Sequence, residues 1–369
     1  MAERAGGLAR SPQDAGDERS PERKTARSRR PDWRQLIALV LAIACFAHAS
    51  PSRAQTKTGT TFGAFTLIEP DARLAAMGNA GSGAAEGLAG VFHNPGAAGT
   101  LERPALKLVH ANWFAGIRYD WIGYAQPAGR FGNLYGTFTS LNSGDMPVRT
   151  VSQPQGTGEL FNVADIAVSL GVAHKFSLRF AAAAQVNYLQ ETIFHTSAGT
   201  ITFSGGTLYR LSADGLRIGA SLANFGTRAA FSGSDLQIAY DNVGGQNGDN
   251  PALPGSRDTD PFSVPITFRV GLAQPIAIAH DARLVLAADA IHPSDNSESV
   301  SFGAEVVFRD ALGVRVGYQS LFLQDSEVGL TGGAGFRGTL DALHYHVDYG
   351  WADQGRLDAT HRFSFGLLF

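Results

Sequence analysis

The chain has 369 residues, including 44 glycines and one cysteine, with 17% charged and 10% aromatic residues. The formal net charge is −3 and no basic patch is interleaved with aromatic residues, which argues against nucleic acid as a partner. Mean hydropathy is −0.05, as expected for strands with one face in lipid and one in water, although composition alone leaves a glycine-rich β-sandwich open.

The first 54 residues predict a signal peptide with a long polar n-region that is removed on export. Residues 1–30 are rich in Arg, Ser, Asp and Glu and have no core to form, so they are an unusually long n-region or an upstream start-site error. An apolar run follows at 36–49, and Ser52-Arg53-Ala54 supplies an export cleavage site. The run is shorter than the roughly twenty apolar residues that a spanning helix needs.

Two other interpretations of this segment are open. Ser28-Arg29-Arg30 is compatible with a twin-arginine signal, although a barrel must reach the periplasm unfolded. Cys45 follows Ala42-Ile43-Ala44, which lacks the Leu expected three residues before a lipidated cysteine. If Cys45 is only a small apolar member of the signal, the mature chain has no cysteine for a disulfide, a thiolate metal site or a nucleophile.

Fourteen segments after residue 104 alternate apolar and polar side chains with period two. An even number of such strands closes an antiparallel barrel, so the predicted fold is all-β: a transmembrane β-barrel over 105–369 in the outer membrane. The segments are 105–115, 118–128, 132–142, 161–174, 176–190, 199–213, 215–225, 263–274, 282–292, 298–309, 311–321, 327–338, 340–351 and 358–369.

The connections between these segments alternate in length. A barrel with both termini in the periplasm has short periplasmic turns and longer external loops. Two connections do not follow the rule, the short one at Gly116-Ile117 and the rather long one at 275–281. The tight connections are 129–131, 175, 214, 310 and 339, and the longer ones are 143–160, 191–198, 226–262, 293–297, 322–326 and 352–357.

Seven polar or charged side chains fall on the inward face in this register. A shift by one residue would place them in lipid, at about 2–4 kcal/mol for a midplane Arg, so the register is well constrained. They form a structural polar network in the lumen, or some of them line a substrate path. They are Arg269, Asp289, Glu305, Arg315, His344, His346 and Asp348.

Three sequence patterns bear on whether the chain holds a metal, binds calcium or catalyses hydrolysis. His344, His346 and Asp348 share a face, but lumen histidines are commonly hydrated lining, and no metal or cofactor is predicted. The acid-rich stretch 241–260 lacks the spacing of a calcium loop and is interpreted as an external loop. No nucleophile elbow supports a hydrolase, so the chain is not expected to be an enzyme.

The last strand ends as outer-membrane barrels end. One face is aromatic and aliphatic, and the other carries Arg362, Ser364 and Gly366. Soluble half-buried strands alternate in the same way, but the terminal aromatic also resembles the signal that the barrel-assembly machinery recognises. The predicted assembly signal is Phe363, Phe365, Leu367 and Phe369.

The segment before the first strand, 55–104, carries a family resemblance. Its runs Pro70-Asp71-Ala72-Arg73, Ala76-Met77-Gly78 and Asn94-Pro95 are similar in order and spacing to those of the PorV/PorQ family of the FadL-like outer-membrane barrel superfamily. Phe92 stands where the family usually has Trp, and Gly96 where it has Ala. Further matches lie at 288–296, 303–305, 315–318, 348–350 and 360–364.

The resemblance implies a fourteen-stranded barrel whose N-terminal segment folds inward as a partly helical plug or hatch. Asp71 and Arg73 would then pair with lumen charges. The implied plug and gating residues are Asp71, Arg73, Met77, Asn94 and Pro95.

Two functions follow from the resemblance. The first is a cell-surface barrel that binds or shuttles secreted cargo beside a type IX secretion translocon. The alternative is a FadL-like channel for the uptake of hydrophobic small molecules. An apolar lining around the plug would favour the channel, unless these side chains only pack the plug against the wall; they are Phe62, Phe65, Leu67 and Phe92.

Overall fold

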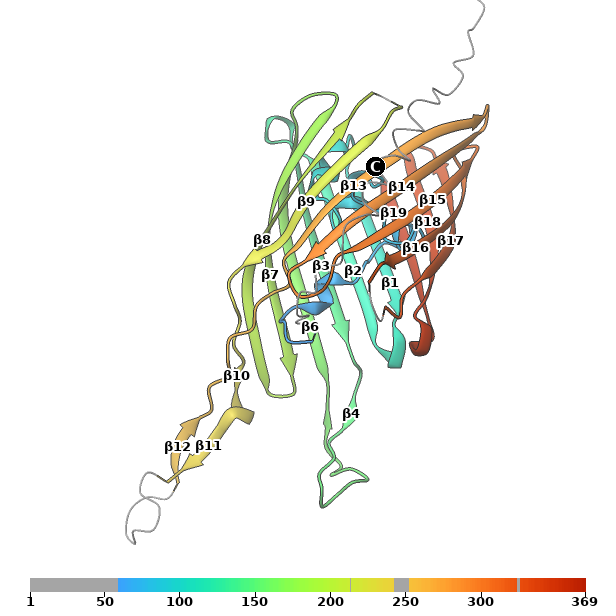
Figure 1. Ribbon diagram of the computed structural model, residues 1–369. Helices are drawn as coiled ribbons and strands as arrows, with labels where there is room; N and C mark the ends of the chain where they lie inside the picture. Colours follow the sequence, from blue (N-terminus) through green and yellow to red (C-terminus); the bar gives the residue numbers. More distant parts are fainter. Residues whose placement is uncertain (1–58, 213, 242–251, 324–325) are drawn as a thin grey trace, which may run out of the picture. The chain divides into compact units, whose positions relative to one another are not determined.

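The computed structural model describes residues 59–212, 214–241, 252–323 and 326–369, so the predicted signal peptide lies outside the described residues. Within them, fourteen antiparallel strands form a closed barrel, which confirms the predicted fold class (Figure 1). The strands are β1 (Ala105–Asn112), β2 (Arg118–Pro127), β3 (Asn133–Asn142), β6 (Val163–Lys175), β7 (Phe180–Ile193), β8 (Thr196–Arg210), β9 (Arg217–Gly226), β13 (Thr267–Ala279), β14 (Ala282–Pro293), β15 (Ser299–Phe308), β16 (Leu312–Leu321), β17 (Leu330–Leu340), β18 (Leu343–Asp353) and β19 (Ala359–Leu368).

Closure joins the first and last strands. β1 pairs with β19 from Ala105 opposite Leu368 to Asn112 opposite His361. The backbone N–H of Phe369 donates to Pro104 O at 3.0 Å and extends this seam past the end of β19. A closed barrel has no sheet edge, so strand backbone groups are paired internally, as the interior of a bilayer requires.

Side chains alternate between the two faces of the wall. On β16, Val314, Val316 and Tyr318 point outward and are 66%, 51% and 45% exposed, whereas Gly313, Arg315 and Gly317 are buried inside. On β19 the aromatic face, including Phe363 and Phe365, is likewise outward. An apolar exterior around a polar interior is typical of a barrel that spans a membrane.

The connections follow the predicted alternation, with two corrections. The predicted loop at 191–198 is wrong: β7 and β8 pair up to Ile193 opposite Thr196, which leaves the two-residue turn 194–195. The polar residues of this stretch belong to strands with a wet inner face, where Glu191 accepts from Gly63 N at 2.6 Å. The long turn at 275–281 is also wrong, because β13 continues through Pro275 to Ala279.

Pro275 is tolerated in β13 because of where the neighbouring strand ends. β9 pairs with β13 only from Thr267 to Ala273. Pro275 therefore lies beyond the part of β13 that is paired on both sides, where a missing backbone N–H costs least.

Smaller elements lie at both ends of the barrel. At the end opposite the C-terminus, β4 (Met146–Pro147) and the hairpin of β11 (Gln237–Tyr240) and β12 (Leu253–Ser256) project outward in Figure 1. Tight 3-10 turns are η4 (Phe114–Gly116), η5 (Gly129–Phe131) and η7 (Gly355–Leu357). The small elements of the two long connections are β4 (Met146–Pro147), β5 (Leu160–Phe161), β10 (Ser232–Gly233), η6 (Ser234–Leu236), β11 (Gln237–Tyr240) and β12 (Leu253–Ser256). Among the described residues, no helix is long and apolar enough to cross a membrane.

Residues 59–104, called the inner segment from here on, run through the barrel interior. The segment contains η1 (Ala64–Leu67), the short helix α2 (Ala72–Ala75), η2 (Gly87–Gly90) and η3 (Pro95–Thr100). Its backbone touches the wall where the wall has glycine: a Cβ at Gly317 would lie 2.2 Å from Gly78 N, and one at Gly303 would lie 2.3 Å from Met77 O. Larger residues at these two positions would push the segment off the wall.

The path of the inner segment follows from its hydrogen bonds. Phe62 N donates to Ser263 O at 3.0 Å, in the long connection before β13. The middle of the segment lies against β15–β18, and its last part reaches the opposite end, where Asn133 Nδ2 at the start of β3 donates to Ala98 O at 2.8 Å. The segment therefore occupies the lumen along most of its length.

We expect the cost of a charge on the outer face to depend on its depth. Val316→Arg in the middle of β16 should destabilise the folded barrel by about 2–4 kcal/mol, and Leu312→Arg at the strand end by about 0–1 kcal/mol. Denaturant unfolding in lipid vesicles measures both. Equal costs for the two variants would contradict this placement of the membrane.

Candidate functional site

Four charged side chains join α2 to the wall and are named the wall cluster: Arg73, Glu305, Arg315 and Asp348. Arg73 Nη2 lies 2.5 Å from Glu305 Oε2, and Arg315 Nε lies 2.8 Å from Glu305 Oε1. Arg315 Nη1 then reaches Asp348 Oδ1 at 2.8 Å. The three wall residues are buried, so their charges have lost their hydration. The ion pairs between them must compensate for this loss.

A second ion pair fixes the start of α2. Asp71 is the N-cap of the helix and accepts from Leu74 N at 3.0 Å. It also forms a buried ion pair with Lys107 on the inner face of β1. Burial alone would raise the pKa of the Asp71 carboxyl, but Lys107 and Arg73 outweigh burial and hold this pKa below its usual range.

A further group of side chains, named the Glu69 cluster, connects residues 69, 82 and 93 of the inner segment to β13, β14 and β19. Glu69 contacts His93, whose Nδ1 lies 2.8 Å from Arg269 Nη1. Arg362 Nε donates to Glu69 O at 2.9 Å. Asp289 accepts from Ser82 N at 2.8 Å. The members are Glu69, His93, Arg269, Asp289 and Arg362, and all are buried.

Asn94 ties separate parts of the chain together. Its Nδ2 donates to Ser82 O at 3.1 Å and to Thr207 O on β8 at 2.8 Å. Its Oδ1 accepts from Gly96 N at 2.9 Å and caps η3, which begins at Pro95. Asn94 is fully buried, so replacing this side chain with an apolar one would leave three polar partners unpaired.

The structure separates the predicted site residues into groups. Arg73, Glu305, Arg315 and Asp348 come together, whereas Arg269 and Asp289 belong to the Glu69 cluster. Met77 carries no charge and packs with Ala273, Val285 and other small apolar residues.

The two predicted lumen histidines are not among the members of the two clusters, although His346 interacts electrostatically with Asp348 of the wall cluster. The ring of His346 lies over Gly366 of β19. His344 is exposed near the turn after β17, where its Nδ1 lies 3.0 Å from Thr339 Oγ1. Within the parts of the chain that are described, no group of three or more His, Cys, Asp or Glu side chains is arranged to hold a metal.

Four partners were not among the predicted site residues: Glu69, His93, Lys107 and Arg362. Lys107 lies between Leu106 and Leu108 on β1, so period-two alternation places it inside. Alternation likewise turns Arg362 inward. Glu69 and His93 lie in irregular backbone, where no periodicity indicates which way a side chain points.

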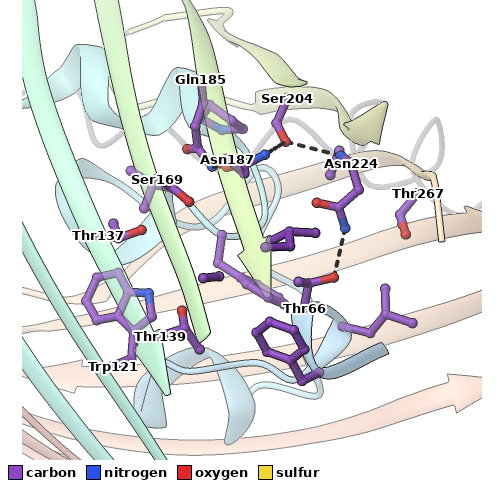
Figure 2. Close-up of a pocket in the computed structure, with 18 of the residues that line it drawn as sticks. Thr66, Trp121, Thr137, Thr139, Ser169, Gln185, Asn187, Ser204, Asn224 and Thr267 are labelled. Carbon is purple, nitrogen blue, oxygen red and sulfur yellow. Dashed lines mark hydrogen bonds between the residues drawn. The ribbon is translucent and has the colours of Figure 1, made fainter. Parts of the chain in front are cut away.

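A cavity of about 700 Å³, including the space at its mouth, lies between the inner segment and the wall. Residues 65–67 of η1 bound it on one side and residues 91–95 on the other. Its wall comes from β2, β3, β6, β7, β8, β9 and β13, which is the part of the barrel away from the wall cluster. Figure 2 shows wall side chains such as Trp121, Ser169 and Asn187 around this space.

The wall of the cavity is largely polar, and part of it is already hydrogen-bonded. Asn187 Nδ2 donates to Ser204 Oγ at 3.0 Å, and Ser204 Oγ accepts from Asn224 N at 3.2 Å. Asn224 Nδ2 donates to Thr66 Oγ1 at 2.9 Å, which connects β9 to η1 (Figure 2). Asn224 takes a left-handed conformation with φ 62°, at a bulge in the pairing of β8 with β9.

The inner segment gives the cavity its apolar side. Phe65, Leu67 and Phe92 line it, together with Val91 and Pro95. Phe62 does not line the cavity and is instead buried beside Phe65, Leu189 and Val264. Of the four apolar residues predicted to surround the plug, one therefore packs the segment against the wall and three face a space that a solute could occupy.

No protein-family model matches the sequence, and no curated protein matches it. Among solved structures, a TodX deltaS2S3 mutant monoaromatic hydrocarbon channel matches with TM-score 0.50 and 12% identity, over 80% of this chain and 96% of the channel. The Ralstonia pickettii toluene transporter TbuX matches with TM-score 0.49 and 12% identity, over 81% and 97%. A Pseudomonas aeruginosa FadL homologue matches with TM-score 0.47 and 11% identity, over 81% and 98%. At these identities the likeness concerns the fold alone.

Removing the shared carboxylate should free the inner segment from the wall. Glu305→Gln leaves Arg73 and Arg315 without their common partner and should cost about 3–5 kcal/mol of folding free energy. The matched control is Glu298→Gln, whose exposed pair with His292 contributes about 0–1 kcal/mol. The measurement is denaturant unfolding together with hydrogen exchange of the α2 amides. Unchanged exchange in Glu305→Gln would contradict the role of the wall cluster.

Proposed function

We propose that this protein is an outer-membrane channel that binds small apolar solutes in the lumen and lets them pass the inner segment. The observation that carries the proposal is the cavity between residues 65–67 and 91–95, with an apolar side, inside a barrel that has the fold of a hydrocarbon channel. Ligand sites in proteins are commonly concave spaces with an apolar lining and a few placed polar groups.

The proposal divides the lumen into a fixed side and a permeable side. The wall cluster and the Asp71–Lys107 pair hold α2 against β1, β15, β16 and β18, and Met77 is packed in the same region. Moving α2 would separate buried charges, which is costly. In this account Asp71, Arg73 and Met77 anchor the inner segment and do not gate it.

The gating elements are then the two parts of the inner segment that bound the cavity. Residues 65–67 meet the wall through the side-chain bond from Asn224 to Thr66, and Asn94 with Pro95 bounds the other side. These particular bonds are between neutral groups, so breaking them costs less than separating the buried ion pairs of α2. Gly63 and His93 stay held by Glu191 and by the Glu69 cluster, so the movement is local to the cavity boundary. A solute would enter from one boundary and leave by the other.

The cargo-binding function implied by the PorV/PorQ resemblance has no support from the fold comparisons and stays a prediction. The transport function is favoured because the similar structures are described as channels or transporters of toluene and other monoaromatic hydrocarbons. The same likeness gives no reason to propose an enzyme.

Filling the cavity should block transport. Ala167 faces the cavity and Val168, the next residue of β6, faces lipid. Ala167→Trp should lower the uptake of radiolabelled ethylbenzene roughly fivefold or more, because the added ring occupies the space that the solute needs. Val168→Trp is the matched control and should leave uptake unchanged. Equal uptake by both variants, at equal amounts of folded barrel, would refute the channel.

A further inference from the structure

Two buried polar atoms, on residues that line the cavity, have no hydrogen-bond partner among the residues that the structure describes. They are Thr267 Oγ1 and Arg269 Nε, and their residues are only 2% and 8% exposed. Both residues line the cavity, and as residues i and i+2 of β13 they project from the same face. A buried donor without a partner is unfavourable, so a ligand that supplies an acceptor here would be stabilised.

Other atoms of the Arg269 side chain already have contacts that hold it in place. Nη1 lies 2.8 Å from His93 Nδ1, and the guanidinium carbon lies 5.0 Å from the centre of the Phe92 ring. Nε is a buried donor of this group that has no partner among the described residues. The Thr267 hydroxyl can donate or accept, so together the two groups suit one oxygen atom of a ligand.

The charges around Arg269 are already balanced. Arg269 interacts electrostatically with Glu69 and Asp289, and Arg362 interacts with Glu69. The two arginines thus face two carboxylates in a buried region. A ligand carboxylate would add a negative charge with no further cation to neutralise it, whereas a carbonyl or hydroxyl oxygen adds none.

We infer that the cavity binds a neutral oxygenated amphiphile, such as an aryl ketone or an alcohol. Its oxygen would accept a hydrogen bond from Arg269 Nε and exchange one with Thr267 Oγ1. Its apolar body would lie against Phe65, Leu67 and Phe92. The inference rests on the proposed transport function and deepens it, because it names a solute class that carries an oxygen and is not a bare hydrocarbon.

The test compares three ligands that share one apolar body: propylbenzene, propiophenone and 3-phenylpropanoate. Each is titrated calorimetrically into the full-length barrel in detergent. Propiophenone should bind about tenfold more tightly than propylbenzene, as expected for one or two hydrogen bonds, and also more tightly than the carboxylate. Thr267→Val should reduce this advantage, because only the bond from Arg269 remains, and Thr267→Ser should keep it in full. The control is Thr192→Val, which removes a hydroxyl from the outer face of β7 and should leave all three affinities unchanged.

The possible outcomes separate the inference from the function on which it rests. If propylbenzene binds as tightly as propiophenone in the wild-type barrel, the inference is overturned and the channel for apolar solutes stands. Tightest binding of 3-phenylpropanoate also overturns it, in favour of an anion site at Arg269. If none of the three ligands binds, the proposed function fails together with the inference. The wild-type series decides between these outcomes even if the Thr267 variants fail to fold.

Discussion

The carboxylate of Glu305 holds together two parts of the chain that are far apart in sequence. Three arginines contact it: Arg73 from the inner segment, and Arg315 and Arg337 from the wall. Arg315 also forms an ion pair with Asp348. None of these groups could be buried alone, since an isolated ion in a low-dielectric interior is expensive. The buried charges on the inner face of the barrel therefore need Arg73 of the inner segment as a partner. The position of the inner segment in turn depends on the strand register that turns Glu305, Arg315 and Asp348 inward.

This dependence explains why the lumen has two unlike sides. Where charges and glycines face inward, the backbone of the inner segment lies directly on the wall, as at Gly303 and Gly317. Where hydroxyls and amides face inward, on β3, β6, β7 and β8, the inner segment still contacts the wall through η3 and Gly63. A cavity remains beside residues 65–67 and 91–95. The distribution of inward side chains thus determines both sides of the lumen. Charges and glycines anchor the inner segment on one side, and hydroxyls and amides surround the space for a solute on the other.

Period-two alternation made most of the wall predictable. It predicts all fourteen strands, the inward charges of β13–β18 and the outward aromatic residues of β19. A strand of such a barrel needs apolar side chains on the face toward lipid and polar or small ones on the face toward the lumen. The errors lay at 191–198 and 275–281, where the strands continue. Both stretches contain a residue type that is depleted in strands, Glu191 and Pro275. The cavity could not be predicted, because it depends on the path of irregular backbone from Phe62 to Pro95, and this path is set by contacts such as those of Asn94 that carry no sequence period.

The most direct test of the account is to locate a bound apolar solute. Crystals of the full-length barrel soaked with bromobenzene would give an anomalous bromine signal that fixes its position. The account predicts a bromine peak inside the lumen, beside Phe65, Leu67 and Phe92 and away from Glu305. A peak only on the outer face of the barrel, or none in the lumen at saturating bromobenzene, would contradict it.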